Sequence, residues 1–156
     1  MNKPTRDGAD PALKQQLTYL VSRLNAKLTA QASRLLKEHS GFSLSQWRLM
    51  AYLDSVGQAR LADFIRFANF DKGQMSRVAQ DLVKRGLLKV EVSAADQRMQ
   101  MLSFTDEGRQ EYERVAPFMS ARRLALYDEF SLEEHEQFTA FIERLEAASE
   151  RLDKDE

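Results

Sequence analysis

Apolar residues recur at helical spacing along most of the chain. The pattern predicts a long first helix that runs from about Leu13 to His39, and Gly41 interrupts it. Ser43 and Gln46 then have the spacing of a capping box, in which each side chain satisfies the backbone N–H of the other. A second helix is therefore expected to begin there and to end near Gly57.

The next segment predicts two helices in close succession. Residues 61–68 fit a helix of about two turns. Asp71, with Gln74 three residues later, can cap a following helix that Gly86 ends. Two short helices separated by a brief polar turn are the spacing of a helix-turn-helix.

The periodicity then changes from helical to alternating. Residues 88–92 alternate with period two, and residues 100–104 can pair with them across a polar connection at 93–99. Two strands joined by a polar loop directly after a helix-turn-helix predict a β-hairpin wing. The wing completes a winged helix-turn-helix over residues 43–104.

Helical spacing returns after the wing and continues to the end of the chain. Thr105 can cap a long helix that contains Pro117, and Ser131 with Glu134 has capping-box spacing for a last helix. The predicted organisation is a loose N-terminal arm (1–11), a first long helix (12–40), the winged region (43–104) and C-terminal helices (105–156). The predicted fold class is mainly α with a small β-hairpin wing.

Charge is distributed unevenly along the chain, although the net charge is only −1. Residues 1–58 hold 8 basic and 4 acidic side chains, residues 59–104 hold 8 and 5, and residues 105–156 hold 7 and 15. The three nets are therefore +4, +3 and −8. A basic middle beside an acidic tail indicates that one face meets a polyanion, although an acidic helical tail is also compatible with a plain solvated surface.

Composition removes several classes of function. The chain has no cysteine and only two histidines, so disulfides, thiol chemistry, a zinc site and a metal cofactor are not expected. It contains no nucleophile–base pair of known spacing and no glycine-rich phosphate loop, so we expect no enzyme and no cofactor. No apolar run is long enough for a membrane span, and the polar start lacks a secretory signal, so a cytoplasmic protein without membrane contact is expected.

The order of the elements and the residues at their joints resemble the MarR family of bacterial and archaeal transcription regulators over almost the whole chain. The resemblance depends on five segments in the family's order and spacing, namely 44–50, 71–77, 82–87, 96–98 and 102–105, with Gly108 following the last. Two features depart from the family pattern. Gly73 lies where the family often has serine or alanine, and the wing has fewer cations than in many members.

The resemblance implies that the helix from Asp71 to Arg85 enters the major groove of double-stranded DNA. Arg77 would bind guanine through two hydrogen bonds, and Gln74 would pair with adenine. The alternative is a solvated helix face on which Arg77 pairs with Asp81 or Asp71. The full set of expected DNA-binding residues on this helix is Lys72, Gln74, Ser76, Arg77, Gln80 and Lys84.

The resemblance also assigns roles outside that helix. Arg98 at the wing tip is expected in the minor groove, with Gln97 beside it and Asp96 bracing the loop. Ser45 and Arg60 are expected to contact phosphates, which position a protein on DNA without reading its sequence.

The long flanking helices carry more apolar positions than a small winged domain can cover, which indicates a partner surface. The resemblance implies a homodimer on an inverted-repeat operator. It further implies a crevice for a small, often aromatic effector, near which His39, Trp47 and Arg48 are candidates. The alternative to ligand contact is a core role for Trp47 and an exposed loop position for His39.

We therefore predict a sequence-specific DNA-binding repressor, or less often an activator, that a small ligand releases. The alternative is a winged-helix module that docks proteins and does not bind DNA.

Overall fold

The computed structural model describes residues 16–92 and 99–152. The chain divides into two compact units, of which the first ends at Phe118 and the second begins at Met119. The predicted arm at 1–11 and the predicted first turn at Leu13 lie outside the described residues. In the part that the structure describes, no helix is both long enough and apolar enough to cross a bilayer.

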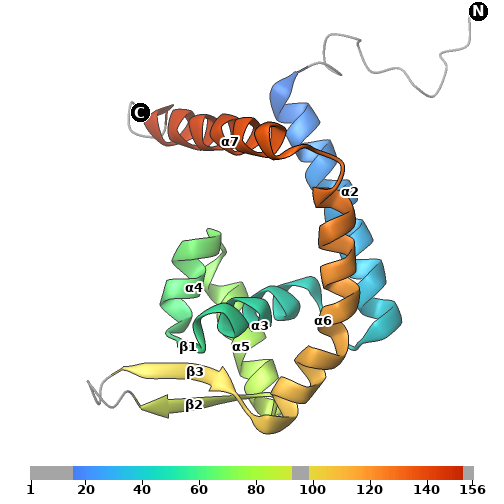
Figure 1. Ribbon diagram of the computed structural model, residues 1–156. Helices are drawn as coiled ribbons and strands as arrows, with labels where there is room; N and C mark the ends of the chain where they lie inside the picture. Colours follow the sequence, from blue (N-terminus) through green and yellow to red (C-terminus); the bar gives the residue numbers. More distant parts are fainter. Residues whose placement is uncertain (1–15, 93–98, 153–156) are drawn as a thin grey trace, which may run out of the picture. The chain divides into compact units, whose positions relative to one another are not determined.

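Helices make up most of both units (Figure 1). The first unit contains α2 (Leu17–His39), α3 (Leu44–Val56), β1 (Gln58–Ala59), α4 (Leu61–Ala68), α5 (Lys72–Lys84), β2 (Leu88–Val92), β3 (Gln100–Phe104) and the start of α6 (Asp106–Tyr127). The second unit contains the end of α6 and α7 (Leu132–Leu152). Every helix and strand expected from the sequence is present, so the mainly helical, winged fold class is confirmed.

The predicted caps account for where the helices begin. The Ser43 side chain accepts a hydrogen bond from the N–H of Gln46, and the Gln46 side chain accepts one from the N–H of Ser43, which is the complete capping box. Asp71 accepts from the N–H of Gln74 at the start of α5 (2.7 Å). Ser131 and Glu134 form a second capping box in front of α7.

The wing is larger than a hairpin, because a third strand joins it. The sheet has the order β1-β3-β2, and both pairings are antiparallel. Strand β1 has only two residues, Gln58 and Ala59, which pair with Ser103 and Leu102 of β3. A strand of this length carries no alternating pattern that a sequence could reveal. The short strand ties the turn after α3 to the wing.

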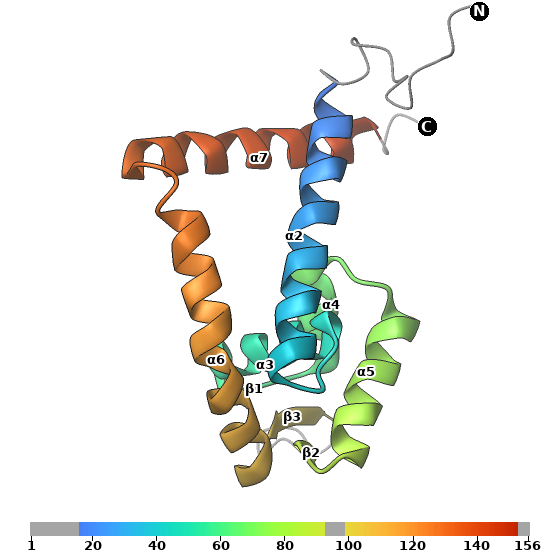
Figure 2. The same ribbon diagram turned by 90° about the vertical axis from the view of Figure 1, so that its right-hand side faces the viewer.

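One apolar core holds the first unit together. Its fully buried side chains come from α2, α3, α5, β2 and α6, and they are Leu36, Leu49, Met50, Leu53, Met75, Leu82, Leu88 and Val115. Helix α5 contributes Met75, Ala79 and Leu82, which lie on one face at spacings of four and three residues. Figure 2 shows α5 as a separate rod that leads directly into β2. The opposite face of α5 is consequently left to solvent.

The start of α6 is attached to the end of α5 by a compact joint. Thr105 donates from its hydroxyl to the carbonyl of Gly86 (2.6 Å) and accepts from the N–H of Gly108 (3.0 Å), as its predicted capping role requires. Gly108 lies so close to Leu87 that a Cβ atom there would be 1.8 Å from the Leu87 carbonyl oxygen. Only glycine fits this position.

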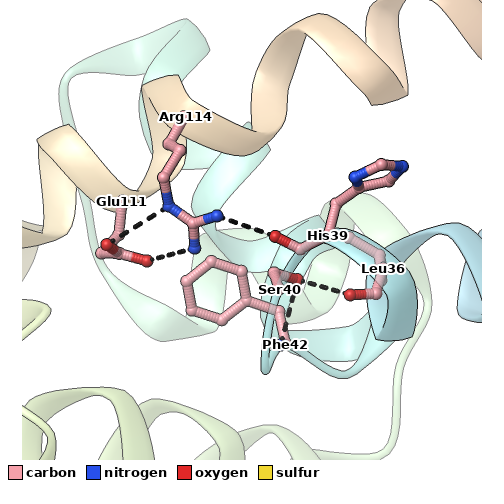
Figure 3. A network of polar contacts seen from close by, with 6 residues as sticks. All are labelled: Leu36, His39, Ser40, Phe42, Glu111 and Arg114. Atoms are coloured by element: carbon pink, nitrogen blue, oxygen red, sulfur yellow. Dashed lines mark hydrogen bonds and ion pairs between the residues drawn. The ribbon is translucent and has the colours of Figure 1, made fainter.

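Arg114 attaches α6 to the end of α2 (Figure 3). Its guanidinium donates to the carbonyl of His39, the last residue of α2 (2.8 Å), and to the carboxylate of Glu111 (2.7 Å). Hydrogen bonds from Arg114 lower the pKa of Glu111 below its ordinary value. The end of α2 is further shaped by Ser40, whose hydroxyl donates to Leu36 and accepts from the N–H of Phe42.

Gly108→Ala tests the joint between α5 and α6. The added methyl group cannot fit against the Leu87 carbonyl, so the backbone must move and the free energy of unfolding should fall by about 2 to 4 kcal/mol. Urea unfolding followed by circular dichroism measures the change. Gly41→Ala is the control, because a Cβ there meets only Arg85 at an ordinary 3.9 Å, and it should change stability by less than about 0.5 kcal/mol. Equal stability of the two variants would contradict the packing described for Gly108.

Candidate nucleic-acid interface

The outer face of α5 presents a continuous row of polar side chains. The residues that turn inward are apolar, so the helix divides cleanly into a packed face and a free face. Five of the six expected DNA-binding residues of this helix are exposed, and Ser76 is half-buried. The exposed ones are Lys72, Gln74, Arg77, Gln80 and Lys84. The core fixes their backbone, while their side chains remain accessible.

Arg77 has no ion-pair partner among the described residues. The two carboxylates that could have neutralised it are used elsewhere. Asp71 accepts the N–H of Gln74 as the cap of α5, and Asp81 accepts a hydrogen bond from Gln46 of α3 (2.7 Å) and pairs with Arg85 (3.7 Å). The alternative in which Arg77 pairs with Asp81 or Asp71 is therefore not what the structure shows.

A hollow of about 380 Å³ lies between α5 and the wing. The register of the sheet pairs Val90 with Leu102, and these two residues form part of its apolar floor. Its polar lining consists of Ser76, Gln80, Lys84 and Gln100. Three of the expected DNA-binding residues thus share one concave surface with a strand of the wing.

The wing tip was expected to contribute Asp96, Gln97 and Arg98, which lie outside the described residues. Arg60, an expected phosphate contact, lies at the base of the wing. It donates two hydrogen bonds to Asp63 (2.8 and 2.6 Å) and one to the sulfur of Met99 (3.7 Å). The bond to Asp63 raises the pKa of Arg60 and lowers the pKa of Asp63, so both side chains remain charged.

Ser45, the other expected phosphate contact, lies in the first turn of α3 and is half-buried. Trp47, two residues further along the same turn, serves packing. Trp47 is buried and stacks on Tyr112 of α6, with 4.8 Å between ring centroids. The hydroxyl of Tyr112 donates to Asp54 (3.1 Å), which also pairs with Arg109. These contacts fix α3 against α6.

A second hollow, of about 590 Å³, lies between α3 and α4. Its lining is largely aromatic and includes two of the three candidate ligand residues, Trp47 and Arg48. The aromatic residues that complete it are Tyr52, Phe64, Phe67 and Phe70. Arg48 is its one charged lining residue, and the guanidinium lies 5.6 Å from the centre of the Phe70 ring.

His39, the third candidate ligand residue, does not line this hollow. Its ring is stacked on Phe118, with 3.7 Å between ring centroids, and its backbone carbonyl accepts from Arg114. The expectation that all three candidates lie at one crevice is therefore not met by the described hollows. The exposed-loop alternative for His39 does not hold either, because the residue ends α2 and is only partly exposed.

Sequence reasoning missed Gln100, which lines the hollow beside α5. It also missed the network next to Arg77, in which Asp81 contacts Gln46 and Arg85. For Gln100 a signal existed, because it lies two residues before Leu102 and thus on the same side of β3. For the Gln46–Asp81 bond, which joins residues 35 positions apart, the sequence carries no local signal.

A helix-turn-helix followed by a sheet of this topology, with the second helix exposed along a polar face, defines a winged helix-turn-helix protein. Residues 40–99 match the sequence model of the MarR family. Among curated proteins, none matches the chain.

Solved structures of MarR-family regulators share the fold. A MarR/EmrR family transcriptional regulator from Acinetobacter sp. ADP1 is 22% identical, with a TM-score of 0.80 over 89% of this chain and 98% of that one. MepR of S. aureus, solved in a complex with DNA, is 18% identical, with a TM-score of 0.77 over 89% and 99%. PcaV of Streptomyces coelicolor, solved with its natural ligand, is 20% identical, with a TM-score of 0.70 over 90% and 99%. The sequence of residues 40–99 is thus similar to the MarR family, and the chain shares the winged helix-turn-helix fold of solved MarR-family regulators.

Proposed function

We propose that this protein is a sequence-specific transcriptional repressor that binds an inverted-repeat operator as a homodimer. The observation that carries the proposal is the polar outer face of α5, on which Arg77 is exposed and not neutralised by any described carboxylate. A rigid helix that presents arginine, glutamine and lysine side chains matches what reading of base edges in the major groove requires. The net charge of +3 in residues 59–104 favours approach to phosphate.

The hollow between α5 and the wing supports the same assignment. A DNA strand that passes beside a recognition helix needs a concave, partly polar surface for its sugar–phosphate backbone. Ser76, Lys84 and Gln100 supply hydrogen-bond donors around an apolar floor. In this assignment Lys84 contacts phosphate, whereas Arg77 contacts bases.

The second unit supports dimerisation, because its described residues form no core of their own. Among its residues whose side chains the structure describes, Met119 is the only buried hydrophobic one. Phe138, Phe141 and Leu145 of α7 are 48%, 55% and 36% exposed and share one helical face. An apolar face of this kind needs a cover, and the second copy of a symmetric dimer supplies the same face in return.

The aromatic hollow between α3 and α4 supports a small aromatic anion as effector. Aromatic walls favour a planar ring, and Arg48 provides the one positive charge for a carboxylate. PcaV, which has the same fold, has been solved with a natural ligand. A ligand of this kind would regulate occupancy only if it bound the DNA-competent and incompetent states with different affinities.

Operator selection tests the DNA-binding assignment. Bound duplexes recovered from a random pool should contain an inverted repeat, and wild-type binding should weaken steeply with salt.

Arg77→Ala should weaken operator binding by about 5- to 150-fold and relax the preference at one base position, because it loses a contact to a base edge. Lys84→Ala should weaken all duplexes alike and lower the salt slope by about one. Arg144→Ala on α7 is the control and should bind like the wild type. If the selection recovered no duplex, that result would favour the protein-docking alternative.

Sedimentation equilibrium tests the dimer. The wild-type chain of 18.0 kDa should sediment at twice that mass. Phe141→Glu introduces a charge on the apolar face of α7, and it should shift the equilibrium to the monomer. Phe67→Glu, at a residue that is 75% exposed on α4, is the matched control and should leave the dimer intact. A monomeric wild type at micromolar concentration would refute the assignment.

Fluorescence of the single tryptophan tests the effector site. Trp47 lines the hollow, so a hydroxybenzoate that binds there should quench its emission in a saturable manner. Arg48→Gln removes the partner of the carboxylate and should weaken binding by about tenfold, as the loss of a charge-assisted hydrogen bond predicts. Arg66→Gln on α4, outside the lining, should have no effect. Quenching that Arg48→Gln leaves unchanged would place the ligand elsewhere.

A further inference from the structure

Asp81 is the one acidic residue within a helical turn of Arg77 on α5. The two residues are four positions apart, which places their side chains next to each other on the helix surface. Arginine and aspartate at this spacing ordinarily attract each other. If they paired, the positive charge that the proposed function gives to DNA would be partly neutralised before DNA arrived.

The structure keeps this pair apart by giving Asp81 two other partners. The side-chain amide of Gln46, at the start of α3, donates to the Asp81 carboxylate (2.7 Å). Arg85, the residue that directly follows α5, lies 3.7 Å from the same oxygen atom. An acidic residue followed four positions later by a basic one is the more favourable order, so Asp81 pairs better with Arg85 than with Arg77.

Arg85 itself is held in place by a second contact. Its guanidinium lies 5.3 Å from the centre of the Phe42 ring, and Phe42 is buried in the core. A guanidinium over an aromatic face is attracted by the ring and loses part of its freedom to turn toward water. The carboxylate of Asp81 is therefore drawn toward α3 and away from Arg77.

Gln46 has two tasks at once. Its carbonyl oxygen accepts the N–H of Ser43 (2.7 Å) as half of the capping box, while its amide nitrogen binds Asp81 (2.7 Å). Glutamate serves equally well in a capping box but has no donor for Asp81. The capping box alone does not explain glutamine at this position.

We propose that Gln46 is a positioning residue for DNA recognition, which together with Arg85 holds the Asp81 carboxylate away from Arg77. This inference rests on the proposed function, because it concerns how the base-contacting arginine is kept available. It predicts that α3 tunes DNA affinity without touching the bases.

Four proteins test the inference: the wild type, Gln46→Glu, Asp81→Asn and the double variant. Gln46→Glu keeps the capping box but repels Asp81, and it should weaken operator binding by about 1.4- to 2.3-fold, the factor that corresponds to one exposed i,i+4 ion pair. Asp81→Asn alone should bind like the wild type, because in the wild type Asp81 does not neutralise Arg77. The double variant should also bind like the wild type. In it the amide introduced on α5 donates to the carboxylate introduced on α3, and no carboxylate remains on α5 beside Arg77. Thermal unfolding of all four checks that the fold is kept.

The pattern across the four proteins separates this mechanism from a simple charge effect. If net charge alone mattered, Asp81→Asn would tighten binding by the factor that Gln46→Glu loses, and that result would overturn the inference. Unchanged binding in Gln46→Glu would overturn it as well.

A second readout needs no DNA. The NMR signal of the Arg77 Nε–H group in the free protein should shift in Gln46→Glu and return in the double variant. An Arg77 signal that does not shift in Gln46→Glu overturns the inference. A wild type that binds no duplex overturns the proposed function. In that case the Arg77 signal alone decides whether Gln46 and Arg85 hold Asp81 away from Arg77.

Discussion

The first unit depends on the burial of one face of α5. This helix has 13 residues, close to the length below which an isolated helix is marginal in water, so packing must hold it in place. Met75, Ala79 and Leu82 provide that packing, and the same helix leaves every residue of its outer face without a structural task in the core. The packed face of α5 thereby serves stability, and the outer face is left for the contacts with DNA that we propose. Substitutions on the outer face should have little effect on the fold.

Helix α6 contacts three other elements of the first unit. At Thr105 and Gly108 it meets the end of α5, at Arg109 and Tyr112 it meets Asp54 of α3, and at Arg114 it meets the end of α2. Each contact uses a different means: close backbone approach, an ion pair beside a hydroxyl, and a guanidinium on a helix-terminal carbonyl. These contacts fix α6 against all three elements.

Much of this architecture could be predicted from the sequence, because it depends on local signals. The capping residues Ser43, Asp71 and Ser131 mark helix starts, and the change of period at Leu88 marks the wing. The rest depends on contacts between distant residues. Strand β1 exists because β3 lies beside it, and the bond from Gln46 to Asp81 exists because two helices cross. The position of His39 against Phe118 also required the tertiary structure, since the spacing of 79 residues carries no local signal.

The first turn of α3 contacts both helix α5 and the aromatic hollow in which we propose that an effector binds. Gln46 contacts Asp81 of α5, Trp47 stacks on Tyr112 of α6, and Arg48 lines the aromatic hollow. Successive residues of a helix point about 100° apart, so Gln46, Trp47 and Arg48 contact different parts of the structure. Because they share one rigid turn, a ligand that moves Arg48 and Trp47 also moves Gln46. If the proposed effector binds in the hollow, Gln46 is the shortest path of described contacts from that hollow to the network beside Arg77.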